Sequence, residues 1–219
     1  MLVADYYRMV GRVKPQIESI TGTRFDLPEY DEVRKMLASY DDFSLAVTFG
    51  RVPGYSFFIH LRHHGFPSPL LDWTRSPYVA AFFAFAAESR GAKRRSIYAW
   101  APSRMSTGGT NTPELKRIGP YVPTHRRHVL QQSDYTICPI YSTADNLWRF
   151  APQEEVIISD NRQPEFQSRL WKFNLPSGER LKVLKQLDAM NMNAYSLFGS
   201  EESLMETMAL RELDLHRQP

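Results

Sequence analysis

The chain is organised around His63-His-Gly-Phe-Pro-Ser-Pro-Leu-Leu-Asp-Trp-Thr-Arg-Ser-Pro77, which leads into the apolar run Tyr78-Val-Ala-Ala-Phe-Phe-Ala-Phe-Ala-Ala87. Ser76-Pro77 predicts a helix start, because Pro is tolerated at the first helical position and Ser caps free backbone N–H groups. The helix that follows is apolar on every face. We therefore expect it in the core of a sizeable domain, ended by Gly91.

Polar side chains gather where the chain enters this helix. The two prolines within the stretch favour an extended path, so residues 70–74 predict a short buried strand or turn. Asp72, Thr74 and Ser76 then lie at a strand-to-helix junction, where free backbone N–H groups attract anions and polar side chains commonly hold a ligand. The same side chains also suit a purely structural interpretation, in which they only cap and brace the junction.

The stretch resembles the signature of the FRG domain family. Weaker similarity extends to Arg127-His-Val-Leu-Gln-Gln-Ser-Asp-Tyr135 and to Asn193-Ala-Tyr-Ser-Leu-Phe198, so the resemblance covers roughly residues 55–213. The family is named for a Phe-Arg-Gly near its start, which this chain lacks. Tyr7-Arg8-Met9 takes that place, with Arg12 as the alternative. We expect either that Arg8 anchors a phosphate or that the first element of the family pattern is missing upstream.

Composition sets the broad class of the protein. A length of 219 residues with 42% hydrophobic and 13% aromatic content is enough for one domain with a full core. The sequence shows no apolar run long enough to cross a bilayer and no secretory leader, so we expect a soluble protein without a membrane partner. The single cysteine, Cys138, fits a small core residue in a reducing cytoplasm. A net charge of +3 permits a nucleic-acid partner without arguing for one.

The order of helical and extended patterns predicts an α+β fold: a single domain with a mixed, largely antiparallel sheet and flanking helices. Residues 1–54 are expected to form an N-terminal, mostly helical part and residues 55–219 the FRG-like core. A long loop at 102–125 is expected to be a mobile cover. The pattern predicts helices at 1–13, 29–40 and 55–64, the last of them ended by Gly65. Ser177 is predicted to cap one further helix, and Ser200 another that turns Leu204, Met205, Met208 and Leu213 inward. A strand or helix is predicted at 43–49, and strands at 96–101, 135–141, 156–159 and 170–175.

Several common enzyme classes lack their motifs here. The phosphate loop Gly-x-x-x-x-Gly-Lys-Ser/Thr and the dinucleotide motif Gly-x-Gly-x-x-Gly are both absent, which excludes kinase and classical dehydrogenase interpretations. Ser200 is the only serine with glycine spacing near that of a hydrolase nucleophile, and it is better explained as a helix cap.

A zinc site is the weaker alternative for the histidines. His60 and His64 share a helix face, and His125 and His128 are three residues apart, so four imidazoles can in principle meet one divalent ion. No other metal motif accompanies them. We favour histidines that lie near an anionic ligand.

More distantly, the FRG segment is similar to the core of ADP-ribosyltransferases, in which NAD is a substrate. Residues 71–80 would correspond to the central sequence segment of that site, and residues 131–135 to its C-terminal segment. Such a site must hold a pyrophosphate and stabilise an oxocarbenium-like ribosyl transition state. The resemblance implies Gln131, Gln132 and Asp72 as catalytic residues, with Asp134 or a later Glu as an alternative charge. The implied NAD-binding residues are Arg8, His63, His64, Trp73, Thr74, Ser76, Arg126, Arg127 and Tyr135.

The resemblance implies an NAD-dependent ADP-ribosyltransferase-like effector. It would be a bacterial toxin of a toxin–antitoxin or phage-defence system, acting on nucleic acid or protein and restrained by an antitoxin or inhibitor protein. The alternative is a non-catalytic or metal-assisted nucleic-acid-binding domain that uses His125-Arg-Arg-His128 and Lys93-Arg-Arg95 as a phosphate-facing patch.

Overall fold

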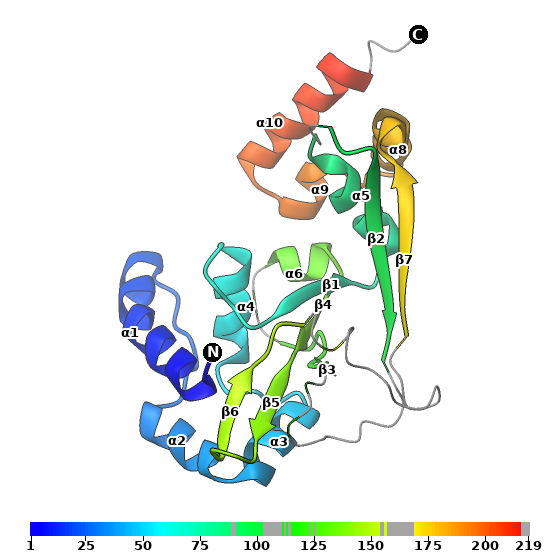
Figure 1. Cartoon of the computed structure of the whole chain (residues 1–219). Coiled ribbons are helices and arrows are strands. Elements are labelled where there is room, and N and C mark those ends of the chain that lie inside the picture. The colour runs from blue at the N-terminus through cyan, green and yellow to red at the C-terminus, as the bar shows by residue number, and fades with distance from the viewer. Residues whose placement is uncertain are drawn as a thin grey trace. The chain divides into compact units, whose positions relative to one another are not determined.

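The computed structural model describes residues 1–88, 91–102, 111, 113, 115–122, 124, 126–153, 156 and 169–215 (Figure 1). Its contacts divide the chain into two compact units. Unit 1 comprises Met1–Trp73, Pro102–Thr124 and Asp134–Ser168, and unit 2 comprises Thr74–Ala101, His125–Ser133 and Arg169–Pro219. Helices combined with small sheets confirm the α+β class. The division into residues 1–54 and 55–219 stays a prediction.

Unit 1 begins with helices whose inner faces build its core. They are α1 (Val3–Thr21), α2 (Tyr30–Ala38), α3 (Tyr40–Thr48) and α4 (Tyr55–His63). The core is rich in aromatic rings, and its fully buried members include Tyr6, Phe43, Phe57, Phe58, Ile59, Tyr135 and Ile137.

The prediction that the first helix ends before Pro15 is wrong, because α1 continues through this proline. On its N-terminal side the helix buries Tyr6 completely. On its C-terminal side the carboxylate of Glu18 accepts a hydrogen bond from the Phe25 backbone N–H (2.7 Å) and pairs with Lys14 (3.0 Å). Contacts on both sides therefore hold the helix across a proline that costs about 3 kcal/mol in a helix interior.

The next helices follow the sequence pattern closely. The helix predicted at 29–40 is confirmed as α2, but it ends at Ala38, and the Ser39 hydroxyl caps α3 by accepting from the Asp42 N–H (3.3 Å). The segment at 43–49, which the pattern left open, is helical. The helix α4 ends as expected, with Gly65 in the left-handed conformation (φ 81°).

The strands of unit 1 form two small sheets. One has the order β1-β4-β3, with β1 (Leu71–Thr74), β4 (Ser133–Ile137) and β3 (Lys116–Arg117), and the other is the antiparallel hairpin of β5 (Pro139–Ser142) and β6 (Leu147–Phe150). Thr74 and Ser133, at the ends of β1 and β4, are counted with unit 2.

Two expectations about these strands are corrected. The strand β1 forms where predicted, but Leu71 is 36% exposed and Asp72 is also exposed, so only Leu70 just before it is buried. The strand predicted at 135–141 is interrupted at Cys138, which separates β4 from β5 and is buried as expected.

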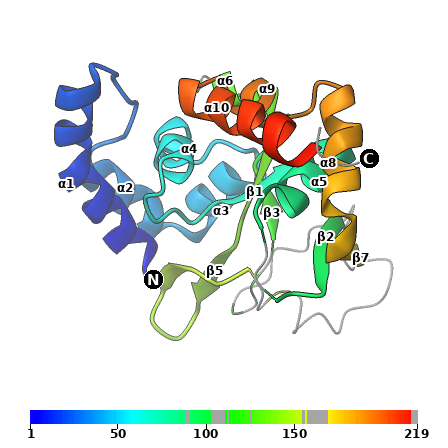
Figure 2. The same ribbon diagram turned by 90° about the horizontal axis from the view of Figure 1, so that it is seen from above.

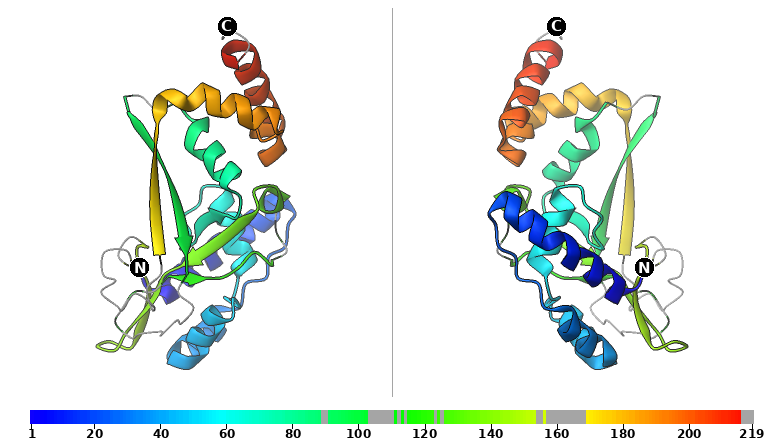
Figure 3. Two further views of the ribbon diagram at one scale, coloured as in Figure 1. Left: turned by 90° about the vertical axis from the view of Figure 1, so that its right-hand side faces the viewer. Right: turned by 90° about the vertical axis from the view of Figure 1, so that its left-hand side faces the viewer.

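Unit 2 combines a long two-stranded ribbon with short helices. The ribbon pairs β2 (Arg94–Ala101) with β7 (Arg169–Pro176) in antiparallel register, which confirms both predicted strands (Figure 3). The helical elements are α5 (Pro77–Ala86), α6 (Arg126–Leu130), η2 (Ser177–Glu179), α8 (Arg180–Ala189), α9 (Ala194–Phe198), α10 (Glu201–Ala209) and η3 (Leu210–Leu215). The buried apolar cluster of this unit comprises Val79, Phe82, Phe85, Leu184, Leu187, Ala194 and Leu197.

The helix α5 begins as predicted and is less buried than predicted. The Ser76 hydroxyl caps it by accepting from the Val79 N–H (3.3 Å). Tyr78 and Phe83 are 54% and 46% exposed, because only one stripe of this uniformly apolar helix faces the cluster. The helix ends at Ala86, well before Gly91.

Of the two predicted caps of the C-terminal helices, which are seen from above in Figure 2, only one forms. Ser177 does not cap α8: it begins the turn η2, and its buried hydroxyl has no hydrogen-bond partner within the described residues. Ser200 does cap α10, through a reciprocal pair with Ser203. However, Met205 and Leu213, which were expected to face inward, are both 55% exposed.

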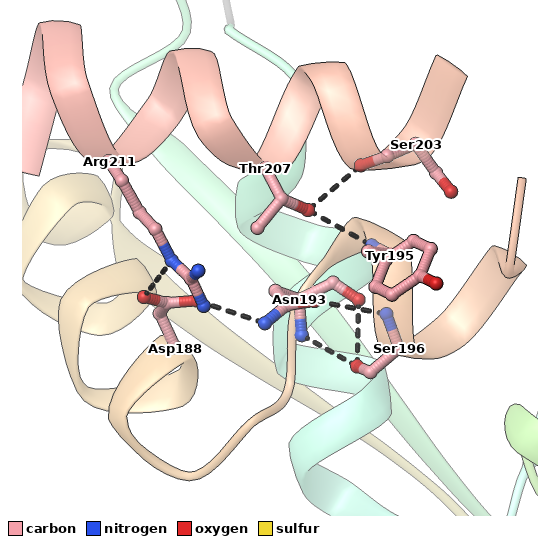
Figure 4. A network of polar contacts seen from close by, with 7 residues as sticks. All are labelled: Asp188, Asn193, Tyr195, Ser196, Ser203, Thr207 and Arg211. Carbon is pink, nitrogen blue, oxygen red and sulfur yellow. Dashed lines mark hydrogen bonds and ion pairs between the residues drawn. The ribbon is translucent and has the colours of Figure 1, made fainter. Parts of the chain in front are cut away.

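A polar network replaces the expected apolar contact of α10 (Figure 4). The Arg211 guanidinium donates to both carboxylate oxygens of Asp188 (2.8 and 2.9 Å), which also accepts from the Asn193 amide (3.0 Å). The Thr207 hydroxyl, on the buried side of α10, accepts from the Tyr195 N–H (3.0 Å). These bonds satisfy polar groups that burial would otherwise penalise, so α10 turns a polar face inward.

Some predicted features fall outside the described residues. The strand at 156–159 is described only at Val156, and the loop at 102–125 is described in part. The described part of that loop pairs with the sheet, since Lys116 and Arg117 of β3 lie opposite Ile137 and Thr136. None of the helices in the described part of the chain combines the length and the apolar character that a membrane span requires.

Candidate functional site

Two segments far apart in the sequence meet in unit 2. The Thr74 hydroxyl at the end of β1 donates to the backbone oxygen of Gln131 (2.8 Å), and the Arg75 N–H donates to the backbone oxygen of Gln132 (3.1 Å). These hydrogen bonds directly join residues 71–80 and 131–135, the two segments predicted to form the site. We call Thr74, Arg75, Ser76, Gln131 and Gln132 the junction–turn site.

Three side chains of this site also brace it. The Thr74 hydroxyl accepts from the Ser76 N–H (3.1 Å), and the Ser76 hydroxyl caps α5. The amide of Gln131, only 8% exposed, donates to the Leu197 backbone oxygen of α9 (3.2 Å). The polar groups of Thr74, Ser76 and Gln131 therefore fix the geometry of the junction, as the structural interpretation expects.

Gln132 differs from its neighbours in both backbone and exposure. Its φ is 49°, in the left-handed region that residues other than glycine seldom adopt, and its side chain is exposed. Its backbone oxygen holds Arg75, so the turn after α6 is fixed while the amide side chain points away from the packed interior. Backbone strain of this kind is often found at functional sites.

The cations beside this site have two different environments. Arg75 and Arg126 are exposed, and within the described residues neither guanidinium has a hydrogen-bond or ion-pair partner. Arg127 is half-buried: its Nε donates to the Phe198 backbone oxygen (3.4 Å), and its guanidinium lies 5.4 Å from the centroid of the Phe198 ring. Arg75 and Arg126 are therefore available to an anion, while Arg127 ties α6 to α9.

A second group of predicted residues lies in unit 1, around Tyr135. The Nε2 of His63, at the end of α4, is 2.8 Å from the hydroxyl of Tyr135, which is fully buried in β4. The Tyr55 ring meets Tyr135 edge-on at 6.0 Å, and its hydroxyl donates to the Gly119 backbone oxygen (2.5 Å). Burial raises the pKa of Tyr55, and the neighbouring Tyr135 and Asp134 add to the shift.

Asp134, the alternative source of negative charge, is already engaged in this group. Its carboxylate pairs with Arg117 of β3 and accepts from the Tyr135 N–H (2.9 Å). The hydrogen bond to Asp134 raises the pKa of Arg117. Beside it, the Trp73 indole N–H donates to the Thr136 hydroxyl (2.9 Å). The unit 1 group is an internally bonded set of polar side chains around the buried Tyr135 and Asp134.

Asp72 and Arg8 lie apart from these contacts, on the surface of unit 1. The Asp72 carboxylate pairs with Arg62 (2.7 Å), and both side chains are more than a third exposed. Arg8 pairs with Asp5 (3.1 Å) and donates to the Tyr30 hydroxyl (2.5 Å). Each is held by exposed contacts within unit 1.

The described histidines of the predicted zinc site are divided between the two units. The rings of His60 and His64 lie 4.4 Å apart in unit 1, while His128 is buried in unit 2 and His125 lies outside the described residues. Across the part of the chain that the structure describes, no three or more His, Cys, Asp or Glu side chains are grouped as a metal site.

Comparison with known families matches residues 9–93 to the FRG domain. This match contains the whole signature stretch at 63–77 together with Arg12, and it supports the FRG resemblance for that segment. Arg8 lies one residue before it. No curated protein and no solved structure shows significant similarity to the chain. The weaker similarity at 127–135 and 193–198, and the likeness to ADP-ribosyltransferases, stay predictions.

Sequence reasoning did not select Arg75 as a site residue. Arg75 stands between the two polar residues of the junction, just before the capping Ser76, and a guanidinium at the entry to an apolar helix has to remain at the surface. The position of Arg75 within the signature stretch therefore already indicated an exposed cation. Tyr55 and Arg117 had no comparable signal, because their contacts with β4 join segments distant in the sequence.

Proposed function

We propose that the chain is an NAD-dependent ADP-ribosyltransferase-like enzyme and that NAD binds at the junction–turn site. The observation that carries this proposal is the direct hydrogen bonding of Thr74 and Arg75 to Gln131 and Gln132. These are the segments that the family resemblance assigns to one site, and they meet although 57 positions separate the first pair.

The exposed side chains of the site suit two groups of NAD, the pyrophosphate and the ribose that becomes positively charged. A guanidinium forms paired hydrogen bonds with phosphate oxygens, so Arg75 and Arg126 would hold the pyrophosphate of NAD. The Gln132 amide oxygen would stabilise positive charge that develops on the ribose. Thr74, Ser76 and Gln131 would act as positioning residues, since their polar groups fix the backbone that carries Arg75 and Gln132.

The reaction itself transfers the ADP-ribosyl group. The bond between the nicotinamide ring nitrogen and ribose C1′ breaks, and its electron pair leaves with nicotinamide. A nucleophilic atom of the acceptor then forms a bond to C1′ and loses its proton to water. The acceptor would be nucleic acid or protein. The role as a bacterial toxin or defence effector, with an inhibitor protein that restrains it, rests on the FRG resemblance.

Calorimetric titration of the full chain with NAD tests the binding site. We expect Arg75→Gln to weaken NAD binding by about tenfold or more, because a charged hydrogen-bonding partner of the pyrophosphate is lost. Arg34→Gln is the matched control, since Arg34 is an exposed cation of α2 in unit 1. Equal affinity of the wild-type, Arg75→Gln and Arg34→Gln proteins would contradict the assignment. Binding of nucleic acid without any binding of NAD would favour the non-catalytic alternative.

A further inference from the structure

The ribbon of β2 and β7 exposes aromatic rings on both of its faces. Residues directly opposite in an antiparallel pair share a face. Tyr98 lies opposite Lys172 on one face, and Trp171 lies opposite Ala99 on the other. Phe173, two residues along β7, shares the face of Trp171. Tyr98, Trp171 and Phe173 are 47%, 46% and 53% exposed.

The helix α5 covers only one end of this ribbon. Leu175 packs against the apolar cluster of unit 2, and the Arg95 guanidinium donates to the Ala84 backbone oxygen (2.6 Å) and lies over the Phe85 ring. Trp171 and Phe173 lie further along the same face, where their rings stay exposed. A ribbon with aromatic rings left open on two faces is unusual for a surface that needs only to be solvated.

The charges of the ribbon all have one sign. Its two strands of eight residues contain Arg94, Arg95, Arg169 and Lys172 and have no Asp or Glu. Lys93 immediately precedes β2. The Lys172 ammonium lies 5.6 Å from the centroid of the Tyr98 ring, so a cation and an exposed ring occur together on one face. A polyanion would be attracted to the same surface that offers flat apolar rings.

We propose that the β2–β7 ribbon binds single-stranded nucleic acid. Unpaired bases would stack on Trp171 and Phe173 on one face or on Tyr98 on the other, and Arg94 and Lys172, which share the face of Tyr98, would meet the phosphates there. A duplex keeps its bases stacked inside and cannot use the rings. An acidic protein segment would use the cations but would leave the exposed rings without a matching partner. That this nucleic acid is the acceptor of ADP-ribose rests on the proposed function.

Fluorescence titration without NAD tests this inference on the full chain, with a 15-nucleotide thymidine oligomer and the duplex of the same length as probes. We expect the single strand to bind more tightly than the duplex, as read from the fluorescence anisotropy of an end-labelled oligomer, a signal that does not depend on Trp171. Trp171→Ala combined with Phe173→Ala should weaken single-strand binding by about tenfold or more, because base stacking on aromatic side chains is lost. Lys172→Gln should lower the dependence of affinity on salt concentration by about one unit of slope.

The matched control is Phe49→Ala, which removes a ring that is 68% exposed in unit 1. Its affinity for the single strand should equal that of the wild type. Melting curves of all variants exclude loss of fold, and Tyr98→Ser provides a second ring variant on the opposite face. Unchanged affinity in the ring variants would overturn the proposal, as would equal affinity for duplex or for heparin, since either result would indicate attraction by charge alone. Because no NAD is present, this result is independent of whether the chain transfers ADP-ribose.

Discussion

The Tyr135 group of unit 1 and the junction–turn site of unit 2 are both held by hydrogen bonds between segments distant in the sequence, and they differ in what they leave exposed. In unit 1, the hydroxyl of Tyr135 is buried against His63, and Asp134 is held by Arg117. In unit 2, buried bonds hold the backbone while the side chains of Arg75 and Gln132 face outward. In the unit 1 group the polar side chains bond one another and stabilise the fold. In the junction–turn site the side chains of Arg75 and Gln132 stay exposed and can bind a ligand.

The largest expected effect is on stability in unit 1. Tyr135→Ala should lower the free energy of unfolding by about 3–5 kcal/mol, because a fully buried ring is removed from the core. Tyr135→Phe, which removes only the hydroxyl partner of His63, should cost about 1–3 kcal/mol. Urea denaturation followed by circular dichroism measures both. If Tyr135→Ala left stability intact and abolished NAD binding, the division between the two groups would be wrong.

A smaller loss of stability is expected from the brace in unit 2. Thr74→Val keeps the shape of the side chain but removes the hydroxyl that bonds Gln131 and Ser76, at a cost of about 1–3 kcal/mol. Thr74→Ser retains the hydroxyl and should stay near the wild type. Thermal melting distinguishes them. A Thr74→Val protein as stable as the wild type would show that this bond does not hold the junction.

Asp72 should matter little to the fold. Its ion pair with Arg62 is partly exposed, and such pairs contribute about 0–1 kcal/mol. Asp72→Asn should therefore melt close to the wild type, with Arg62→Gln as the partner control. Activity lost without a change in melting would support the catalytic role predicted for Asp72. A collapse of the melting temperature would instead show that Asp72 is structural.

The smallest effect is a pH dependence in unit 1. The Phe25 N–H, followed by Lys14, lowers the pKa of Glu18, so this carboxylate stabilises the fold above its unfolded pKa of about 4.3 and loses that contribution as pH falls through the folded value. Glu18→Gln should melt below the wild type at pH 7, and the gap should narrow as the pH falls below the unfolded pKa of about 4.3. Melting curves across this range provide the check. A gap that does not change with pH would contradict the charged contact.

Local signals in the sequence predicted some of the helix boundaries. The caps Ser76 and Ser200 and the terminator Gly65 act through neighbours a few residues away, so their roles follow from position alone. The continuation of α1 through Pro15 depends partly on the burial of Tyr6 against distant segments, and the polar inner face of α10 depends on the hydrogen bond from Tyr195 to Thr207. No local pattern contains that information, which is why both were missed.

The candidate site also has features that the sequence predicted and features that only the fold revealed. Thr74 and Ser76 follow from the strand-to-helix junction, and the family resemblance led to Gln131 and Gln132. The left-handed backbone of Gln132 and the burial of Asp134 became visible only with the fold. Exposure, more than residue type, separates the groups that brace the site from those left open to a ligand.

The release of nicotinamide from NAD by the full chain, compared between wild type and Gln132→Gly, decides whether the junction–turn site catalyses the transfer. Glycine adopts the left-handed backbone of position 132 without strain, so this variant should be at least as stable as the wild type. The account predicts that the wild-type protein releases nicotinamide and that Gln132→Gly does so about 100-fold more slowly at an unchanged or higher melting temperature. Equal rates in the two proteins, or no release by a folded wild type supplied with nucleic-acid and protein acceptors, would contradict it.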